Sequence, residues 1–191
     1  MKVFWFDTET TGLDPYENDI IQIAGIVEID GSVAEEFNFT CAPSNPNNID
    51  PKALEVNKLR REDILKYEPP GVMLKWKLLP LLNKYIQPHD KKDKFLMAGW
   101  NTQFDMRFLR KFWKKNNEDY FGSWFEWVIF DVMVWYVGVE ICTRHPYEDH
   151  KLVSIAAANG IHLDAHDALN DIRVTRELYW KSLETLNHEP I

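Results

Sequence analysis

The amino-acid sequence predicts an α/β protein with a mixed β-sheet. Three strand-like segments come first, and strand-like segments then alternate with helical ones. Residues 3–6, "VFWF", are apolar at every position, which is typical of a strand buried on both faces in the middle of a sheet. This segment is therefore the expected centre of the sheet.

The next two strands are predicted to form a β-hairpin. Residues 19–29, "DIIQIAGIVEI", end at Asp30-Gly31, and a second run resumes over residues 32–39 as "SVAEEFNF". An Asp-Gly pair between two such runs favours a type I′ turn, in which both central residues have positive φ. We expect two antiparallel strands here.

The remaining chain predicts helices that alternate with two further strands. Residues 43–51 form a Pro/Asn-rich loop, "PSNPNNIDP". The expected elements are helical segments over 51–86 (interrupted at Pro69-Pro70), a strand over 95–100, a helix over 102–115, a strand over 127–132, a helical stretch after it, and two closing helices, the last over 167–186. The aromatic residues Phe104, Phe108 and Phe112 recur every four positions, which indicates the core face of a helix.

Length and composition indicate one domain. The chain has 191 residues, of which 45% are hydrophobic and 27% charged. That is enough for one well-cored unit, expected over residues 1–186, with a short tail over 187–191. No apolar run approaches the roughly 20 residues of a membrane span, and acids follow the N-terminus too early for a signal peptide. We expect a soluble, cytoplasmic protein without membrane contact.

Charge and cysteine content exclude some classes of protein. A formal net charge of -8 argues against sequence-independent coating of duplex nucleic acid. It leaves room for a local basic groove, or for an acidic site that meets phosphate through metal ions. Cys41 and Cys142 are far apart and match no metal-ligand spacing, so no disulfide framework or zinc site is indicated.

Two carboxylates stand at the end of the first strand. Asp7 and Glu9 are separated by one residue, so in a strand they project to the same side, and Trp5 before them on that side supplies no positive charge. Burying such a pair without a cation is costly. A divalent cation removes this cost, and carboxylate oxygens are the ligands that Mg²⁺ and Mn²⁺ prefer.

Two further acids are positioned to face the core. Asp105 shares a helix face with Phe108, and Asp171 shares one with Val174. Neither has a Lys or Arg three or four residues away, which weakens a surface salt-bridge interpretation. His166, where the loop enters the last helix, has the side-chain type whose ordinary pKa suits a general base near neutral pH.

The segments "FDTETTG", "NTQFDMRFL" and "HDALND" resemble, in this order, the three motifs of the DEDDh, or DnaQ-like, 3′ to 5′ exonucleases. Each motif alone is weak, but three in order over residues 7–171 are specific. The resemblance implies an RNase H-like fold with a five-stranded mixed β-sheet flanked by helices, the second strand antiparallel. It assigns the catalytic set to Asp7, Glu9, Asp105, His166 and Asp171.

The resemblance also implies a mechanism. The four acids would hold two divalent ions, Mg²⁺ or Mn²⁺, about 3.5–4 Å apart around the scissile phosphate. Asp7 would contact both ions, and Asp105 would hold one directly or through water. His166 would accept the proton of the attacking water, and the product would be a nucleoside 5′-monophosphate.

Three residues are expected to contact substrate. Thr10 and Leu13 resemble family positions that hydrogen-bond the 3′-hydroxyl and wedge beside the terminal base, although an exposed Leu in a tight turn is more often plain packing. Asn101 also matches the family, and it competes with Thr102 for the N-cap of the following helix. Trp100 departs from the family pattern, in which a His often precedes this Asn.

The function predicted from the sequence is a metal-dependent 3′ to 5′ exonuclease for single-stranded or frayed ends, with DNA favoured. An RNA-end trimming exoribonuclease or oligoribonuclease is the alternative among enzymes. A catalytically silent nucleic-acid-binding module is the alternative outside enzymes, although all five catalytic residues are present. The expected partners are nucleic acid with a free 3′ end and a separate polymerase chain.

Three other polar residues are not expected to take part in catalysis. Asp131 is expected to cap a helix, and His89 and His162 are expected to be ordinary loop residues.

Overall fold

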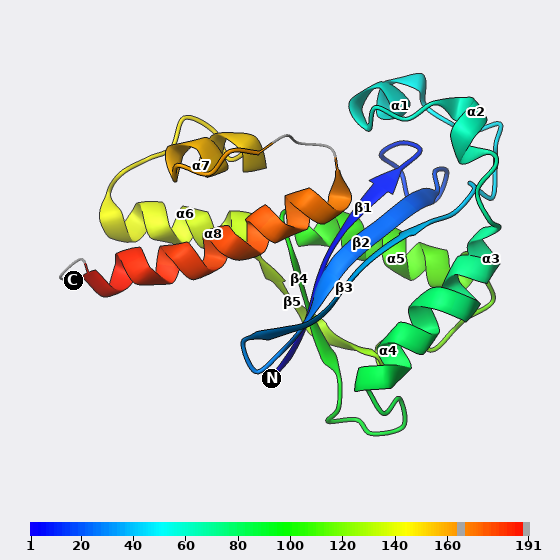
Figure 1. Ribbon diagram of the computed structural model, residues 1–191, viewed down its shortest axis with the longest axis horizontal. Coiled ribbons are helices and arrows are strands. Elements are labelled where there is room, and N and C mark those ends of the chain that lie inside the picture. Colours follow the sequence, from blue (N-terminus) through cyan, green and yellow to red (C-terminus); the bar gives the residue numbers. More distant parts are fainter. Residues whose placement is uncertain (164–166, 189–191) are drawn as a thin grey trace.

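A computed structural model describes residues 1–163 and 167–188 of the chain, and shows a five-stranded sheet flanked by helices (Figure 1). The strands are β1 (Lys2–Thr10), β2 (Ile20–Ile29), β3 (Ser32–Thr40), β4 (Phe95–Gly99) and β5 (Phe125–Asp131). The helices are α1 (Pro51–Val56), α2 (Arg61–Ile64), α3 (Pro70–Met73), η1 (Leu74–Leu78), α4 (Leu79–Tyr85), α5 (Thr102–Lys115), η2 (Phe121–Ser123), α6 (Val132–Thr143), α7 (Leu152–Ala158) and α8 (Ala168–His188). The predicted fold class is confirmed.

The sheet has the order β3-β2-β1-β4-β5, with β1 in the middle. Strand β2 runs antiparallel to β1 and β3, whereas β4 runs parallel to β1 and β5. Asp30 has φ 49° and Gly31 has φ 84°, which confirms the type I′ geometry of the β2–β3 turn. The carboxyl ends of β1, β4 and β5 therefore meet at one edge, where ligands gather in sheets of this kind.

Each face of β1 contributes to a separate hydrophobic core. Phe4 and Phe6 pack on the side of α4 and α5, where the Phe4 ring stacks on Phe37 at 5.1 Å between centroids. Val3 and Trp5 pack on the other side, under α6, α7 and α8. Figure 1 shows the two groups of helices on opposite sides of the sheet. Because side chains alternate along a strand, Asp7 and Glu9 continue the face of Val3 and Trp5.

The helical region before β4 is more divided than the sequence predicts. Pro70 begins α3, which continues through the π-helical η1 into α4, so the expected interruption at the prolines is present. A second interruption separates α1 from α2, where Lys58 has φ 54°. Asn57, which ends α1, donates its side-chain amide to the Thr10 carbonyl at 3.0 Å, and this contact anchors α1 beside the end of β1.

Smaller differences concern the ends of elements. Strand β5 begins at Phe125, two residues before the expected start, and α8 extends to His188, two residues beyond the expected end. Among the described residues, no helix combines the length and apolar character needed to cross a membrane. Both cysteines are free thiols; Cys41 is buried and Cys142 is exposed.

Candidate active site

The Asp7–Glu9 pair lies at the carboxyl end of the central strand, as predicted. Asp7 is half-buried and Glu9 is buried. The pairing register of β1 with β2 shifts between Glu9 and Thr10, so the regular ladder is interrupted directly after the pair. The chain turns away there, which leaves the two carboxylates at the edge of the sheet.

Asp105 is buried in the first turn of α5 and is oriented by Thr8. Its Oδ1 accepts hydrogen bonds from the Thr8 backbone N–H at 3.0 Å and from the Thr8 hydroxyl at 2.6 Å. Since Thr8 stands between Asp7 and Glu9, these bonds hold the Asp105 carboxylate next to the pair. Thr8 was not predicted from the sequence, because nothing in its motif separates it from an ordinary strand threonine.

The acids influence one another strongly. Burial raises the pKa of Asp7 well above its ordinary value, and the charges of Asp105, Glu9 and Asp171 raise it further. Burial, followed by the charges of Asp171 and Asp105, raises the pKa of Glu9 to about 7. Burial also raises the pKa of Asp105 to about 7, although the hydrogen bonds from Thr8 oppose it. The structure thus brings the four predicted acids together from β1, α5 and α8.

The chemistry of this group suits a hard divalent cation. The charged neighbours that shift the pKa values of Asp7 and Glu9 are all carboxylates, and oxygen donors are what Mg²⁺ and Mn²⁺ require. Within residues 1–163 and 167–188, no three His, Cys, Asp or Glu side chains converge tightly enough to hold an ion as they stand. Like charges repel, so we expect full convergence only around a cation.

A cavity of about 310 Å³ opens beside Glu9. Leu13, Val56 and Phe104 are among the side chains that form its apolar wall. Leu13 is 82% exposed, so its side chain is not packed in a core. The Thr10 hydroxyl, at the same cavity, donates to the Gly12 carbonyl at 2.7 Å and so holds the turn in which Leu13 lies.

Phe104 packs against the core as predicted, but only from its margin. Phe108 and Phe112 are buried as expected, but Phe104 is half-buried and lines the cavity, with its ring centroid 4.9 Å from that of Phe108. The sequence offered one indication that Phe104 borders the site: it immediately precedes Asp105 at the start of the helix. The i, i+4 spacing alone could not distinguish it from the core residues.

Asn101 occupies the N-cap position of α5 without capping it. Its backbone is left-handed, with φ 55° and ψ 43°, and its side chain makes no cap hydrogen bond. Thr102 does not cap the helix either, because its hydroxyl donates to the Phe130 carbonyl at 2.9 Å. Asp131 confirms its predicted role: its Oδ1 accepts from Met133 N at 3.0 Å and caps α6, and it also accepts from Asn101 N at 3.0 Å.

Trp100 has a structural role on the other side of this turn. Its indole N–H donates to the His150 carbonyl at 3.2 Å, and its ring lies 6.0 Å from that of Tyr136. Trp100, which replaces the His often found here in the family, therefore connects the end of β4 to α6 and to the segment before α7.

His166 lies outside the described residues, so its role stays a prediction from the sequence. Asp171 is described; it is half-buried in the first turn of α8. Of the predicted substrate contacts, Thr10 and Leu13 line the cavity, and Asn101 stands exposed at the start of the same helix as Phe104.

A five-stranded mixed sheet with acids at the end of its central strand and in the first turns of two helices defines an RNase H-like nuclease fold. The family model described as Exonuclease (RNase_T) matches residues 4–179. The chain belongs to this family, the DEDDh or DnaQ-like 3′ to 5′ exonucleases of the RNase H-like superfamily, which are hydrolases. Members of the family generally use divalent metal ions.

Similar proteins include DNA polymerases and exonuclease I. The chain is 26% identical to DNA polymerase III PolC-type from Latilactobacillus sakei over 92% of its own length and 11% of that protein's. It is 20% identical to E. coli exonuclease I in complex with a dA16 oligonucleotide, with a TM-score of 0.77 over 96% of this chain and 41% of that one. A zinc-bound E. coli exonuclease I complex with single-stranded DNA gives 19% identity and a TM-score of 0.77 over 98% and 41% of the two chains. The chain thus spans less than half the length of these proteins.

Proposed function

We propose that this chain hydrolyses phosphodiester bonds from the 3′ end of single-stranded or frayed DNA and releases nucleoside 5′-monophosphates. The observation that supports this best is the position of the four acids: the other three lie close enough to Asp7, at the carboxyl edge of β1, to raise its pKa, and a cavity opens to the surface beside Glu9. The resemblance to the DEDDh exonucleases assigns catalysis to these four acids. The similarity to DNA polymerase III PolC-type and to exonuclease I in complex with a DNA oligonucleotide favours DNA over RNA.

In this proposal Asp7, Glu9, Asp105 and Asp171 hold two divalent ions, Mg²⁺ or Mn²⁺. When bound there, the ions would activate a water molecule and stabilise the charge that develops on the scissile phosphate and the leaving 3′-oxygen. Thr8 keeps the Asp105 carboxylate turned toward the pair through its two hydrogen bonds. His166 accepts the proton from the attacking water.

The cavity beside Glu9 is the proposed place of the terminal nucleotide. Leu13 and Phe104 would hold the base between an aliphatic and an aromatic side chain, and stacking on an aromatic ring tolerates any base. Thr10 and Asn101 would contact the terminal sugar and its 3′-hydroxyl. The similarity to PolC also supports a polymerase as a partner of this domain.

The proposed function predicts a strict need for a free 3′ end. With Mg²⁺ or Mn²⁺, a 5′-labelled DNA 20-mer should shorten one nucleotide at a time, because the terminal cavity accepts only a chain end. The same 20-mer with a 3′-phosphate should resist by at least about tenfold, since the phosphate adds charge beside the acids. The measurement is product length against time on a sequencing gel.

Matched RNA and closed circular DNA serve as controls in this experiment. A circle should remain intact, and RNA should be degraded more slowly than DNA. Faster degradation of RNA would favour the exoribonuclease alternative. Nicking of the circle would indicate an endonuclease. If no substrate is hydrolysed, the result would favour a catalytically silent nucleic-acid-binding module.

The raised pKa values predict how the stability of the metal-free protein depends on pH. The pKa of Glu9 rises from 4.5 to about 7 on folding, so between these values the folded protein binds more protons than the unfolded chain. Stability of the metal-free protein should therefore fall as pH rises through this window. At pH 8, Mg²⁺ or Mn²⁺ at about 100 times Kd should raise Tm by about 5–10 °C.

Thermal unfolding at pH 5.5 and 8, with and without the ions at constant ionic strength, measures both effects. Glu9→Gln is the control variant, since the amide does not titrate; it should reduce both the fall with pH and the gain from metal. If the Tm of the metal-free protein rises steadily from pH 5.5 to 8, the carboxylates do not repel one another in the folded protein as proposed.

A further inference from the structure

The outer face of α5 carries a stripe of positive charge. The stripe consists of Arg107, Arg110, Lys111 and Lys114, which follow the i, i+3, i+4, i+7 spacing of a single helix face. Lys111 is half-buried and the other three are exposed. On a protein with a net charge of -8, four cations on one helix face form a distinct positive surface.

Most of this charge is not neutralised by neighbouring acids. In the part of the chain that the structure describes, no carboxylate oxygen lies within 4.0 Å of the charged nitrogens of Arg107, Arg110 or Lys111. Lys114 lies 3.6 Å from Asp119, but both side chains are exposed, and such pairs contribute little. The stripe therefore keeps its affinity for an external anion.

Aromatic rings, and not acids, hold two of the cations in place. The Lys111 ammonium lies 3.6 Å from the centroid of the Tyr16 ring, and the Arg110 guanidinium lies 5.1 Å from that of Phe121. Tyr16 is itself 65% exposed. A ring orients a cation without neutralising its charge, so these contacts preorganise Arg110 and Lys111 for another ligand.

A surface groove of about 350 Å³ runs along the stripe. Pro15 and Tyr16 line it from the β1–β2 loop, and all four stripe residues line it from α5. Glu118 and Asp119 also contribute to its wall, so its formal charge remains positive by two. A groove with a positive wall and an exposed aromatic ring suits single-stranded nucleic acid.

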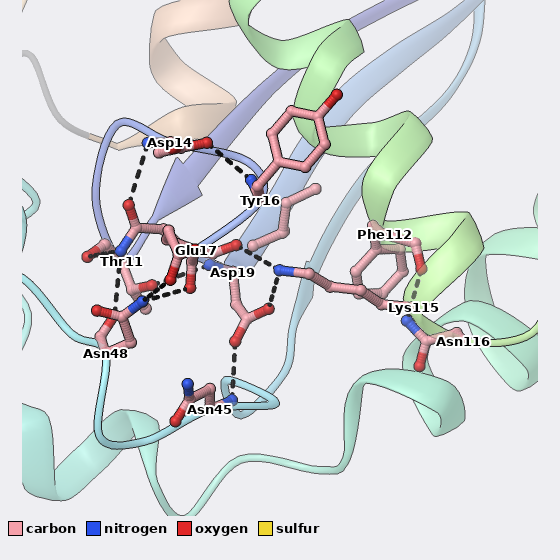
Figure 2. A network of polar contacts seen from close by, with 12 residues as sticks. Thr11, Asp14, Tyr16, Glu17, Asp19, Asn45, Asn48, Phe112, Lys115 and Asn116 are labelled. Atoms are coloured by element: carbon pink, nitrogen blue, oxygen red, sulfur yellow. Dashed lines mark hydrogen bonds and ion pairs between the residues drawn. The ribbon is translucent and has the colours of Figure 1, made fainter.

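The loop that carries Tyr16 is firmly attached to α5 (Figure 2). Lys115, next to the stripe, forms an ion pair with Asp19 at 2.8 Å and also donates to the Asn18 carbonyl at 2.7 Å. Asp19 is only 6% exposed, so this ion pair is shielded from water on the side of the acid. Tyr16 N donates to Asp14 Oδ1 at 2.9 Å, and Figure 2 shows the Tyr16 ring beside α5. Lys115 thus holds the loop, which leaves only the stripe for ligand binding.

The groove and the cavity beside Glu9 are lined by neighbouring residues of the same two segments, α5 and the β1–β2 loop. Phe104 lines the cavity and Arg107 lines the groove, and they are three residues, or about 4.5 Å of helix rise, apart. The β1–β2 loop likewise lines the cavity with Leu13 and the groove with Tyr16. A strand whose last nucleotide occupies the cavity can therefore follow α5 into the groove.

We propose that this groove binds the sugar-phosphate backbone of the substrate strand on the 5′ side of the terminal nucleotide. The proposal rests on the proposed function, because the strand must end in the cavity. From Arg107 to Lys114 the helix rises about 10 Å, which matches about three nucleotides at roughly 3.4 Å each. The stripe contacts the phosphates without reading sequence, and Tyr16 offers its free ring surface to one base.

The test compares two triple variants on a DNA 20-mer and on a substrate too short to reach the groove. The stripe variant is Arg107→Gln/Arg110→Gln/Lys111→Gln. The charge-matched control is Lys75→Gln/Lys91→Gln/Lys92→Gln, whose three lysines are exposed and lie outside the groove. The short substrate is the p-nitrophenyl ester of thymidine 5′-monophosphate, and circular dichroism verifies that both variants fold.

For the stripe variant we expect KM for the 20-mer to rise about tenfold or more at 50 mM salt. The slope of log KM against log salt should fall by about 2, or about 0.7 for each lost phosphate contact. Its kcat/KM for the ester should equal that of the parent protein, and the control variant should match the parent on both substrates. Equal effects of the two triple variants on the 20-mer would overturn the proposal, as would an unchanged slope in the stripe variant.

Two further comparisons separate the possible failures. A parent protein that hydrolyses neither ester nor 20-mer would refute the proposed function, whereas normal hydrolysis of the 20-mer by the stripe variant would refute only the groove. Tyr16→Ala should raise KM for the 20-mer several-fold, and Tyr16→Phe should restore it because the ring is retained. A Phe variant as defective as the Ala variant would overturn the stacking role of Tyr16.

Discussion

Replacing Asp7 by Asn is expected to lower turnover on a DNA 20-mer by at least about 10³-fold while the fold persists. Asp7 stands at the centre of the acid group: burial raises its pKa, and the charges of all three other acids, Asp105, Glu9 and Asp171, raise it further. An amide cannot supply the charge that a shared ligand of two ions must provide, and losing several kcal/mol of transition-state stabilisation corresponds to this factor. Initial rates at saturating Mn²⁺ and Mg²⁺, with circular dichroism of the variant, measure the effect.

The same substitution should make the metal-free protein more stable. Removing one charge from a repelling group lowers the cost of burying the others, so Tm without metal should rise at pH 8, whereas the gain in Tm from metal should be largely lost. Asp90→Asn, at an exposed loop position, is the matched control and should change neither quantity. Turnover near that of the parent protein in Asp7→Asn would end the two-metal proposal.

Replacing His166 by Ala is expected to lower kcat by about 10²- to 10⁴-fold, the usual contribution of a positioned general base. The proposal assigns His166 the proton of the attacking water, so its imidazole must be neutral at rest, and cations held by the neighbouring acids disfavour the imidazolium. Metal affinity and KM should change little. The acidic limb of the pH–rate profile should weaken or vanish.

His162→Ala is the matched control for this experiment, because it removes a histidine four residues earlier that is exposed. It should leave kcat and the pH profile unchanged. If His166→Ala lowers only Tm and keeps its turnover per folded molecule, the histidine is structural and the base lies elsewhere in the site.

Much of the fold follows from local sequence patterns. The apolar run over residues 3–6 predicted the central strand, and Asp30-Gly31 predicted the type I′ turn, because both depend on short-range backbone and burial preferences. The boundaries were less accurate. At the break after α1, Asn57 contacts Thr10, a residue 47 positions away, and no local sequence pattern predicts such a contact.

The acids of the candidate site could also be found from the sequence, since an acid on a core-facing position without a nearby base is conspicuous in a helix or strand. The interactions around them could not. Thr8 binds Asp105 across 97 residues, and it is the packing of α5 on β1 that makes this contact possible.

The sequence by itself determined which residues of this protein carry charge, which faces of its elements are apolar, and which motifs resemble the exonuclease family. Only the tertiary structure decided that Phe104 borders a cavity, that Lys111 lies over Tyr16, and that Lys115 pairs with the buried Asp19. The physical reason is that a pattern along one helix defines its faces but not what stands opposite them. The five cations of α5 cannot be distinguished from the sequence. Their contacts in the tertiary structure show that Lys115 holds the β1–β2 loop, and we propose that the four residues of the stripe bind a ligand.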